Sequence, residues 1–140
     1  LLVRWAPQVK VLAHTSVGLF LTHAGWNSTL ESISMGVPVV GLPYFADQYL
    51  NCRFAQDVWE VGLNFEGVEV GEQKVVSKEE VEGIVRAMMT TTKGEQLRKN
   101  ALKMKEYATK AVVPGGSSFN NLSTFIKDMG RKAGTQSQNE

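Results

Sequence analysis

The chain has 140 residues, a length that fits one domain of ordinary size, and its 43% hydrophobic and 21% charged residues are typical of a globular protein. Its formal net charge of +1 gives no electrostatic reason to expect a nucleic acid or an anionic membrane as a partner. The single cysteine, Cys52, excludes a disulfide within the chain, and no apolar run is long enough to predict a membrane span.

Short apolar runs and helical patterns alternate over the first 61 residues. The expected strands cover residues 1–3 (the end of a strand), 17–23 and 37–43, and the expected helices cover residues 9–14, 27–35 and 48–61. The last two strands are predominantly apolar, which is typical of parallel strands buried on both faces. On the second helix we expect Leu30 and Ile33 to face inward and Gly36 to end the helix. The third helix carries an apolar stripe of Leu50, Phe54, Val58 and Val61.

The second half of the chain is predicted to be mostly helical. Residues 63–66 indicate an edge strand, and Ser77 begins a helix to about residue 89, whose first turn, residues 77–80, fits a capping box. Apolar stripes at helical spacing predict two later helices. The stripes consist of Leu97, Ala101, Met104, Ala108 and Ala111, and of Phe119, Leu122, Ile126 and Met129. Residues 130–140 are polar, which predicts a disordered tail.

Strands that alternate with helices through short links predict a doubly wound parallel α/β sheet. In such sheets, ligands bind beyond the carboxyl ends of the strands. Three segments are expected at that edge, namely residues 5–8, 22–28 and 43–48. The unusual polar and aromatic residues of the first fifty positions fall on these segments, and this coincidence predicts a ligand site.

The segment THAGWNSTLES, residues 22–32, carries the strongest chemical signal. Gly25 permits a ligand to approach the backbone closely. Asn27 and Ser28 are expected at the start of a helix, where unpaired backbone N–H groups and the helix dipole favour an anion. Such a position suits a phosphate or diphosphate, and His23 adds a side-chain donor.

Residues outside that segment extend the predicted site. Glu31 could accept hydrogen bonds from the paired hydroxyls of a ribose, and Trp5 offers a flat face on which a base can stack. Asp47 and Gln48 begin another helix and carry groups suited to sugar hydroxyls. From the residues alone, we expect a nucleotide that carries a diphosphate, with or without a sugar.

Each of these assignments has a structural alternative. Glu31 could close a capping box with Ser28, because the two residues have the required spacing, and the two roles do not exclude each other. Trp5 could be a packing residue of the core or the surface. We expect His14 to be structural, hydrogen-bonded to a backbone group.

Residues 5–48 resemble the signature box of plant secondary-product UDP-glycosyltransferases, which runs from a Trp to a Gln over 44 residues. The match consists of WAPQ, His14, FLTHAGWNSTLES, GVPVV and LPYFADQ, without a gap. The later segments NCRFAQDVWEVG and GGSSFNNLSTFIKDM also resemble this family, so the resemblance covers about residues 1–129. Ala24 departs from the pattern, since the family often has Cys there.

The resemblance implies a Rossmann-like fold, namely the donor-binding C-terminal part of a GT-B enzyme, incomplete at its N-terminal side. It implies no metal or other cofactor, and UDP-glucose as the favoured donor. The implied contacts are Trp5 and Ala6 with uracil, Gln8 and Glu31 with ribose, His23, Asn27 and Ser28 with the diphosphate, and Trp26, Asp47 and Gln48 with the sugar.

The resemblance also implies an enzyme that transfers glucose, with inversion, to a hydroxyl or carboxyl of a small lipophilic acceptor. It implies a cytoplasmic location, in the cytosol of a plant cell. The family's catalytic His and its supporting Asp belong to the N-terminal domain, so we expect no catalytic residue among these 140. The strand-like opening LLVRW predicts a fragment that binds the donor without catalysis. The alternative is a stand-alone nucleotide-sugar binding module without turnover.

Overall fold

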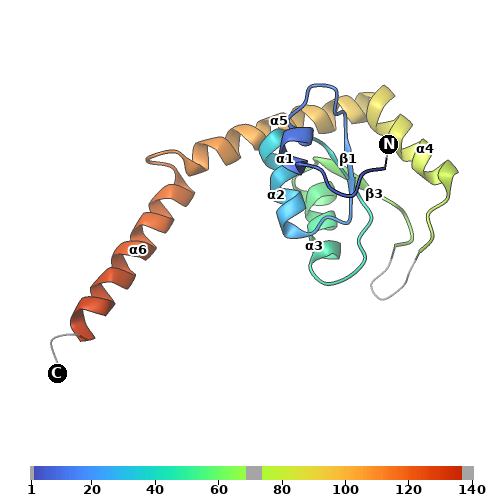
Figure 1. The fold of residues 1–140 in the computed structure, drawn as a ribbon. Coiled ribbons are helices and arrows are strands. Elements are labelled where there is room, and N and C mark those ends of the chain that lie inside the picture. Colours follow the sequence, from blue (N-terminus) through green and yellow to red (C-terminus); the bar gives the residue numbers. More distant parts are fainter. Residues whose placement is uncertain (1, 69–73, 137–140) are drawn as a thin grey trace. The chain divides into compact units, whose positions relative to one another are not determined.

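The computed structural model describes residues 2–68 and 74–136 (Figure 1). By its internal contacts the chain divides into a larger unit, Leu1–Lys105, and a smaller one, Glu106–Glu140, which are taken in turn. In chain order the elements are α1 (Gln8–Leu12), β1 (Phe20–Thr22), α2 (Trp26–Met35), β2 (Val39–Gly41), α3 (Gln48–Arg53), the π-helix η1 (Phe54–Val58), β3 (Gly62–Asn64), α4 (Lys78–Thr90), α5 (Thr92–Val112) and α6 (Ser117–Gln136).

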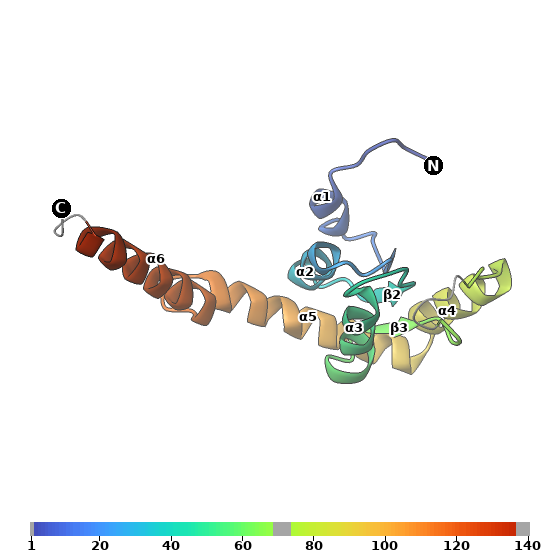
Figure 2. The same ribbon diagram turned by 90° about the horizontal axis from the view of Figure 1, so that it is seen from below.

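The larger unit contains a parallel sheet in the order β1-β2-β3, with Leu21 opposite Val40 and Val40 opposite Leu63. Helix α2 connects β1 to β2, and α3 with η1 connects β2 to β3, so both crossovers are helical (Figure 2). Parallel strands joined by helical crossovers confirm the expected α/β class. Within the described residues, β1 and β3 are the two edges of the sheet.

Two buried apolar clusters hold the larger unit together. The first joins the sheet to α4 and α5, and the second joins η1 to α5. Their buried members are Val40, Phe65, Met88 and Leu97 in the first cluster and Ala55, Val61 and Ala101 in the second. Full burial of a Val, Leu, Phe or Met side chain contributes about 1.5–3 kcal/mol, so these clusters fix the scaffold from which the loops after β1 and β2 extend.

The expected strands are shorter in the structure. Leu2 and Val3, predicted to end a strand, are exposed and lie in no strand, and Leu1 lies outside the described residues. The strand predicted at 17–23 is reduced to β1, and its Leu21 is exposed rather than buried. The reason is that Leu21 faces a hollow shared with Leu42 and Val68, not a helix packed on the sheet.

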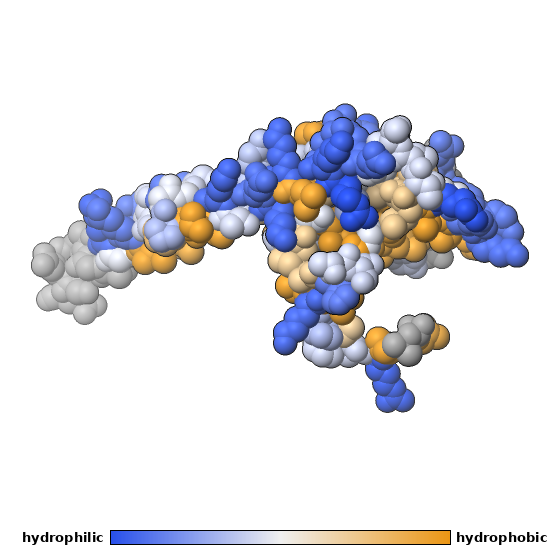
Figure 3. Space-filling view, turned by 90° about the horizontal axis from the view of Figure 1, so that it is seen from above, coloured by the Kyte–Doolittle hydropathy of each residue, from blue (hydrophilic) through white to orange (hydrophobic). Residues whose placement is uncertain are grey.

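The predicted inward faces of two helices are wrong in part, although Ile33 and Val61 are buried as expected. Leu30 of α2 is 43% exposed and Leu50 of α3 is 59% exposed, and Phe54 and Val58 of the same stripe are exposed as well. Ile33 is buried as predicted, and the structure buries further residues that were not predicted, namely Thr29 and Ser32 on α2, Gln48, Asn51 and Cys52 on α3, and Ala55 on η1. Figure 3 shows hydrophobic areas among hydrophilic ones on one face of the molecule.

Hydrogen bonds explain why polar side chains occupy these inward positions. The Thr29 hydroxyl donates to the Ala24 carbonyl at 3.2 Å, and the Ser32 hydroxyl donates to the Val37 carbonyl at 2.7 Å. A hydrogen bond from a buried polar side chain to a loop carbonyl stabilises that loop. Hydrophobic periodicity alone cannot predict this stabilisation. The helix predicted at 48–61 also changes type at η1, where the Trp59 N–H donates to the Phe54 carbonyl at 2.8 Å.

Helix ends follow the sequence more closely. Gly36 ends α2 in the left-handed conformation, with φ 71°, as expected for a glycine at this position. Ser77 begins α4 with the predicted capping box, because the Glu80 N–H donates to the Ser77 hydroxyl and the Glu80 carboxylate accepts from the Ser77 N–H. Leu97 and Ala101 of the stripe on α5 are buried, and Met104 is half-buried.

The smaller unit is helical, and its last helix is α6. The predicted stripe of Phe119, Leu122, Ile126 and Met129 lies on α6 and is exposed within this unit. Helix α6 continues to Gln136, so the structure is helical beyond Gly130, where the sequence predicted a disordered tail, and residues 137–140 lie outside the described residues. None of the described helices combines the length and apolar character that a membrane crossing requires.

Candidate functional site

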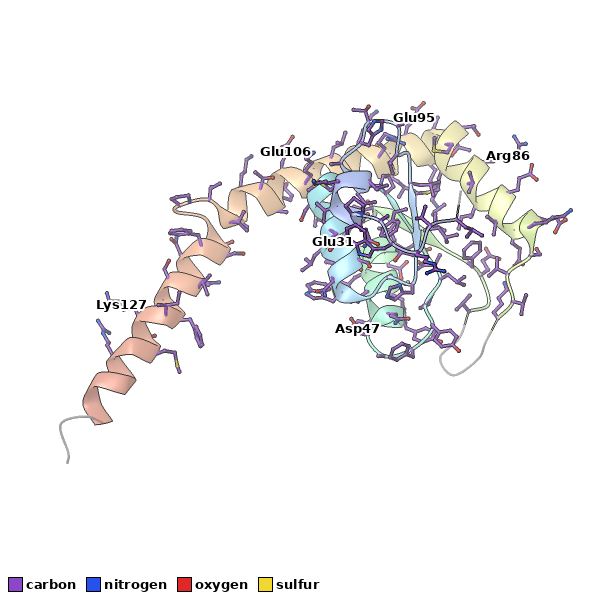
Figure 4. The ribbon with its side chains drawn as sticks, viewed as in Figure 1. Glu31, Asp47, Arg86, Glu95, Glu106 and Lys127 are labelled. Carbon is purple, nitrogen blue, oxygen red and sulfur yellow. The ribbon has the colours of Figure 1, made fainter. Side chains whose placement is uncertain are left out.

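The structure brings three of the predicted donor-binding residues together. The Gln8 amide on α1 donates to the Glu31 carboxylate at 2.6 Å and lies 3.3 Å from the Ser28 hydroxyl, both on α2. These partners are 23 and 20 residues from Gln8 in the sequence. The contact places the start of α1 against the first turns of α2, and Figure 4 shows Glu31 on α2 beside α1.

The same geometry excludes one alternative for Glu31. Helix α2 begins at Trp26 with Gly25 as its N-cap residue, so Ser28 lies inside the first turn and cannot be the N-cap. A capping box between Ser28 and Glu31 is therefore wrong. Glu31 instead accepts a hydrogen bond from Gln8. This contact is exposed, so a ligand at the surface can reach both side chains.

The start of α2 has the properties of an anion site. The Thr29 N–H donates to the Gly25 carbonyl at 3.0 Å, which is the first hydrogen bond of the helical pattern. The N–H groups of the three residues before Thr29 therefore have no acceptor within the helix. The first turn contains no acidic residue that would compete with an anionic ligand for the positive end of the helix dipole. Asn27 and Ser28 lie in this turn, as predicted.

His23 stands over the same helix start. A methyl group added at Gly25 would lie 2.7 Å from Nε2 of His23, so the ring occupies the space that a larger residue at position 25 would fill. The His23 side chain is exposed. The His23 ring therefore lies at the first turn of α2, where the sequence analysis expects an anion.

The loop after β2 carries the other predicted polar residues. Figure 4 shows Asp47 at the start of α3, and its carboxylate accepts a hydrogen bond of 2.7 Å from the Asn51 amide. Gln48 is buried, and its side-chain oxygen accepts from the N–H groups of Tyr44 and Phe45 at 2.8 and 3.1 Å. Gln48 thus also has a structural role that its sequence pattern did not indicate.

Both tryptophans of the predicted site are at the surface. Trp5 is 79% exposed, which excludes a packing role in the core, and Trp26 is exposed at the first position of α2. Trp5 lines an open groove of about 660 Å³ together with Ala6, Gln8 and Glu31. A flat aromatic face beside hydrogen-bonding side chains is the arrangement that a nucleoside requires.

His14 and the largest described hollow lie outside the candidate donor site. Nδ1 of His14 accepts from the Ser16 N–H at 3.2 Å, which confirms the structural role expected for His14. A larger hollow of about 900 Å³ lies beside β3, with Gln56, Leu63 and Gln96 in its lining, and contains none of the predicted donor-binding residues. Among the described residues, no cluster of three or more His, Cys, Asp and Glu side chains could hold a metal ion.

Sequence reasoning missed Asn51. Its amide joins the Asp47 carboxylate to the Ala24 carbonyl, which lies in the loop after β1. Ala24 and Ala46, one in each loop, have positive φ angles of 57° and 56°. Such strained alanines persist where the surrounding structure holds them. The four-residue spacing between Asp47 and Asn51 on a helix was the one signal that could have indicated their contact.

Comparisons with known proteins identify the family of this chain. A family model described as "UDP-glucoronosyl and UDP-glucosyl transferase" matches residues 1–110. The chain is 48% identical to UDP-glycosyltransferase 74E2 of Arabidopsis thaliana over 126 residues, which are 90% of this chain and 27% of that protein. It is 45% identical to the mogroside I-E synthase of Siraitia grosvenorii, again over 90% of this chain and 27% of that protein.

Solved structures show the same likeness. The fold matches that of Os79 from O. sativa in complex with UDP and deoxynivalenol-3-glucoside, with a TM-score of 0.84 and 37% sequence identity. This match covers 91% of the present chain and 29% of Os79. The chain therefore spans little more than a quarter of the length of the proteins that it resembles.

Proposed function

The chain belongs to the UDP-glucoronosyl and UDP-glucosyl transferase family, and from this premise we propose that it is the part of a plant UDP-glycosyltransferase that binds the UDP-sugar donor. The observation that carries the proposal is the cluster of Gln8, Ser28 and Glu31 at the start of α2, in the groove beside the exposed Trp5. The complex of Os79 with UDP supports this ligand class.

In this proposal, the nucleoside lies in the groove of α1. Uracil stacks on Trp5, and backbone groups of Ala6 contact its edge. Glu31 accepts from the ribose hydroxyls, and Gln8 is held in place by Glu31 and contacts the ribose from the same side. Because Trp5 is exposed, stacking on uracil would remove apolar surface from water without rearranging the core.

The diphosphate lies at the first turn of α2. His23, Asn27 and Ser28 contribute side-chain donors, and the unpaired N–H groups of the helix start add to them. The positive end of the helix dipole favours the negative charge that UDP gains when it leaves. The helix start therefore both binds the donor and stabilises the leaving group.

The donor sugar, for which we propose glucose, lies between Trp26 and the start of α3. Oδ2 of Asp47 is held by Asn51, so its other oxygen can accept from a sugar hydroxyl. The side-chain oxygen of Gln48 is occupied by two backbone N–H groups, so its amide nitrogen is the atom directed to donate to the sugar.

The proposed reaction is a displacement at the anomeric carbon with inversion. The oxygen of a hydroxyl or carboxyl group on a small lipophilic acceptor forms a bond to that carbon while the bond to the diphosphate oxygen breaks. A hydroxyl's proton passes to a base that we place outside these 140 residues, so no residue of this chain is assigned a catalytic role. We propose that no metal takes part, and that chelation with EDTA leaves transfer unchanged.

Glu31→Ala tests the proposed site. The variant should weaken UDP by about 10–100-fold, because hydrogen bonds to a charged group contribute about 1.5–3 kcal/mol. Inorganic pyrophosphate, which has no ribose, should bind with little change. Isothermal titration with both ligands measures the two affinities in the protein at its full encoded length.

Glu82→Ala is the matched control, since Glu82 is an exposed helix glutamate that pairs with Arg86 at 2.8 Å, away from the proposed site. It should leave both affinities unchanged. Equal loss of UDP and pyrophosphate in Glu31→Ala would contradict the ribose assignment.

A second experiment tests the absence of catalysis in the chain alone. The purified 140-residue chain, incubated with UDP-glucose and a panel of phenols, should form no glucoside above a control without protein. A missing general base alone slows such reactions by about 10²–10⁴-fold. We expect weak donor binding, about −4 to −6 kcal/mol, because the donor is held from one side only. Glucoside formation would mean that a base lies within this chain.

A further inference from the structure

Asn51 connects the two loops of the proposed donor site. Its side chain is buried, with 7% exposed, on α3. The amide nitrogen lies 2.7 Å from Oδ2 of Asp47, in the loop after β2, and 2.9 Å from the Ala24 carbonyl oxygen, in the loop after β1. The two loops are otherwise separated by α2 and β2 in the sequence.

The chemistry of the two acceptors fixes the orientation of this amide. A carboxylate oxygen and a carbonyl oxygen can only accept, and the amide nitrogen carries the two hydrogens that both need. The reversed amide would place its oxygen against two other acceptors with no hydrogen between them. Asn51 therefore has one stable orientation, in which both of its N–H groups are used.

This contact also fixes Asp47. An aspartate at the start of a helix commonly accepts from N–H groups of the first turn, but Asp47 makes no such bond to α3. Its Oδ2 is bonded to Asn51 instead. The rotamer of Asp47 is thus held by Asn51, and the residue is exposed at the start of α3.

At its other end, Asn51 orients the peptide between Ala24 and Gly25. This carbonyl also accepts from the Thr29 hydroxyl at 3.2 Å, so two buried donors hold it. The peptide between Ala24 and Gly25 is trans, since no described residue follows a cis peptide bond, and in a planar trans peptide the C=O and the N–H point in opposite directions. The Gly25 N–H therefore points away from the buried amide, at the start of α2.

From this geometry we infer that Asn51 is a positioning residue for donor recognition, which aims the Asp47 carboxylate at the sugar and the Gly25 N–H at the diphosphate. The inference rests on the proposed function and assigns a cause to its sugar selectivity. Loss of the amide would release both loops, although Asn51 itself touches no donor atom.

The test uses Asn51→Asp and Asn51→Ala in the protein at its full encoded length. The first variant has nearly the same shape but sets a carboxylate against two acceptor oxygens, and the second removes the donor. Isothermal titration with UDP-glucose, UDP and UMP separates the sugar and diphosphate contributions. We expect the ratio of the UDP-glucose Kd to the UDP Kd to rise about tenfold, because Asp47 loses a charge-assisted hydrogen bond that orients it. The ratio of the UDP Kd to the UMP Kd should rise several-fold.

Asn64→Asp is the matched control. The amide of Asn64, on β3, donates at 3.0 Å to the carbonyl of Cys52. Cys52 lies on α3, as Asn51 does, but outside the donor loops. The substitution therefore also places a carboxylate against a carbonyl. It should lower the melting temperature and leave both ratios unchanged.

Four results contradict the inference, and they are distinguishable. A wild-type protein that binds neither UDP nor UDP-glucose would refute the proposed function itself. If the wild type binds both, unchanged affinities for all three ligands in the two Asn51 variants would show that Asn51 does not position the donor groups. Equal losses for all three ligands, or failure of both Asn51 variants to fold, would make Asn51 a structural residue only.

Discussion

Gly25→Ala perturbs one predicted contact without straining the backbone. Gly25 has φ −58° and ψ 151°, a conformation that alanine adopts freely. The added methyl would meet Nε2 of His23 at 2.7 Å and Cδ2 at 3.3 Å, both near the end of an exposed side chain. The ring can rotate away at little energetic cost, so the variant should fold and displace His23 from the start of α2.

The expected loss follows from the bond that His23 makes. A hydrogen bond to a charged acceptor contributes about 1.5–3 kcal/mol, so UDP should bind about 10–100-fold more weakly. The free energy of unfolding should change by less than about 1 kcal/mol, because a poorer N-cap residue is offset by lower entropy of the unfolded chain. Isothermal titration with UDP and a thermal melt measure the two quantities.

A double-mutant cycle shows whether the effect passes through His23. If it does, Gly25→Ala combined with His23→Ala should bind UDP as His23→Ala does alone. Gly83→Ala on α4 is the control, since a methyl there meets nothing within 4 Å and should only stabilise the helix. Wild-type affinity in Gly25→Ala, or additive losses in the double variant, would refute this reasoning.

Three further outcomes are expected. Trp5→Ala should weaken UDP by about 1–3 kcal/mol through lost stacking, with little change in melting temperature, and unchanged titration with UDP would exclude the stacking role. The Lys74 ammonium and the Ser77 cap lower the pKa of Glu80 from 4.5 to about 2. Their stabilisation of the folded state is therefore fully present above the unfolded pKa of 4.5, and it is lost as the pH falls through the folded pKa of about 2. Thermal melts of Glu80→Gln and wild type should therefore converge as pH falls from about 5 to about 2, and a constant difference would contradict the assignment. Burial raises the pKa of the Cys52 thiol to about 12, so the folded protein should not react with Ellman's reagent at mildly alkaline pH, whereas urea should expose the thiol, and rapid reaction of the native protein would contradict its burial.

The order of strands and helices, and therefore the position of the ligand edge, could be predicted from the sequence because apolar runs and glycines act locally. Gly36 and Ser77 mark helix ends in the structure as they do in the sequence. The contact of Gln8 with Glu31 was not predicted from spacing. It follows from the packing of α1 on α2, which periodicity does not encode, and only the family resemblance had assigned both residues to the ribose.

Ile33 was predicted from hydrophobicity to face inward and is buried, but the polar residues on the inward faces of α2 and α3 could not be predicted in this way. Thr29 and Asn51 are buried with their side chains bonded to the Ala24 carbonyl, and Ala24 has a left-handed conformation. These hydrogen bonds depend on a loop geometry that exists only after folding. Polar residues therefore displaced Leu30 and Leu50 from the positions that their spacing favours.

A crystal structure of the protein at its full encoded length with UDP-glucose would test the donor-site proposal most directly. The proposal predicts uracil on Trp5, the ribose at Gln8 and Glu31, and the diphosphate at the first turn of α2. A donor bound in the larger hollow beside β3, with the groove at Trp5 left unoccupied, would contradict it.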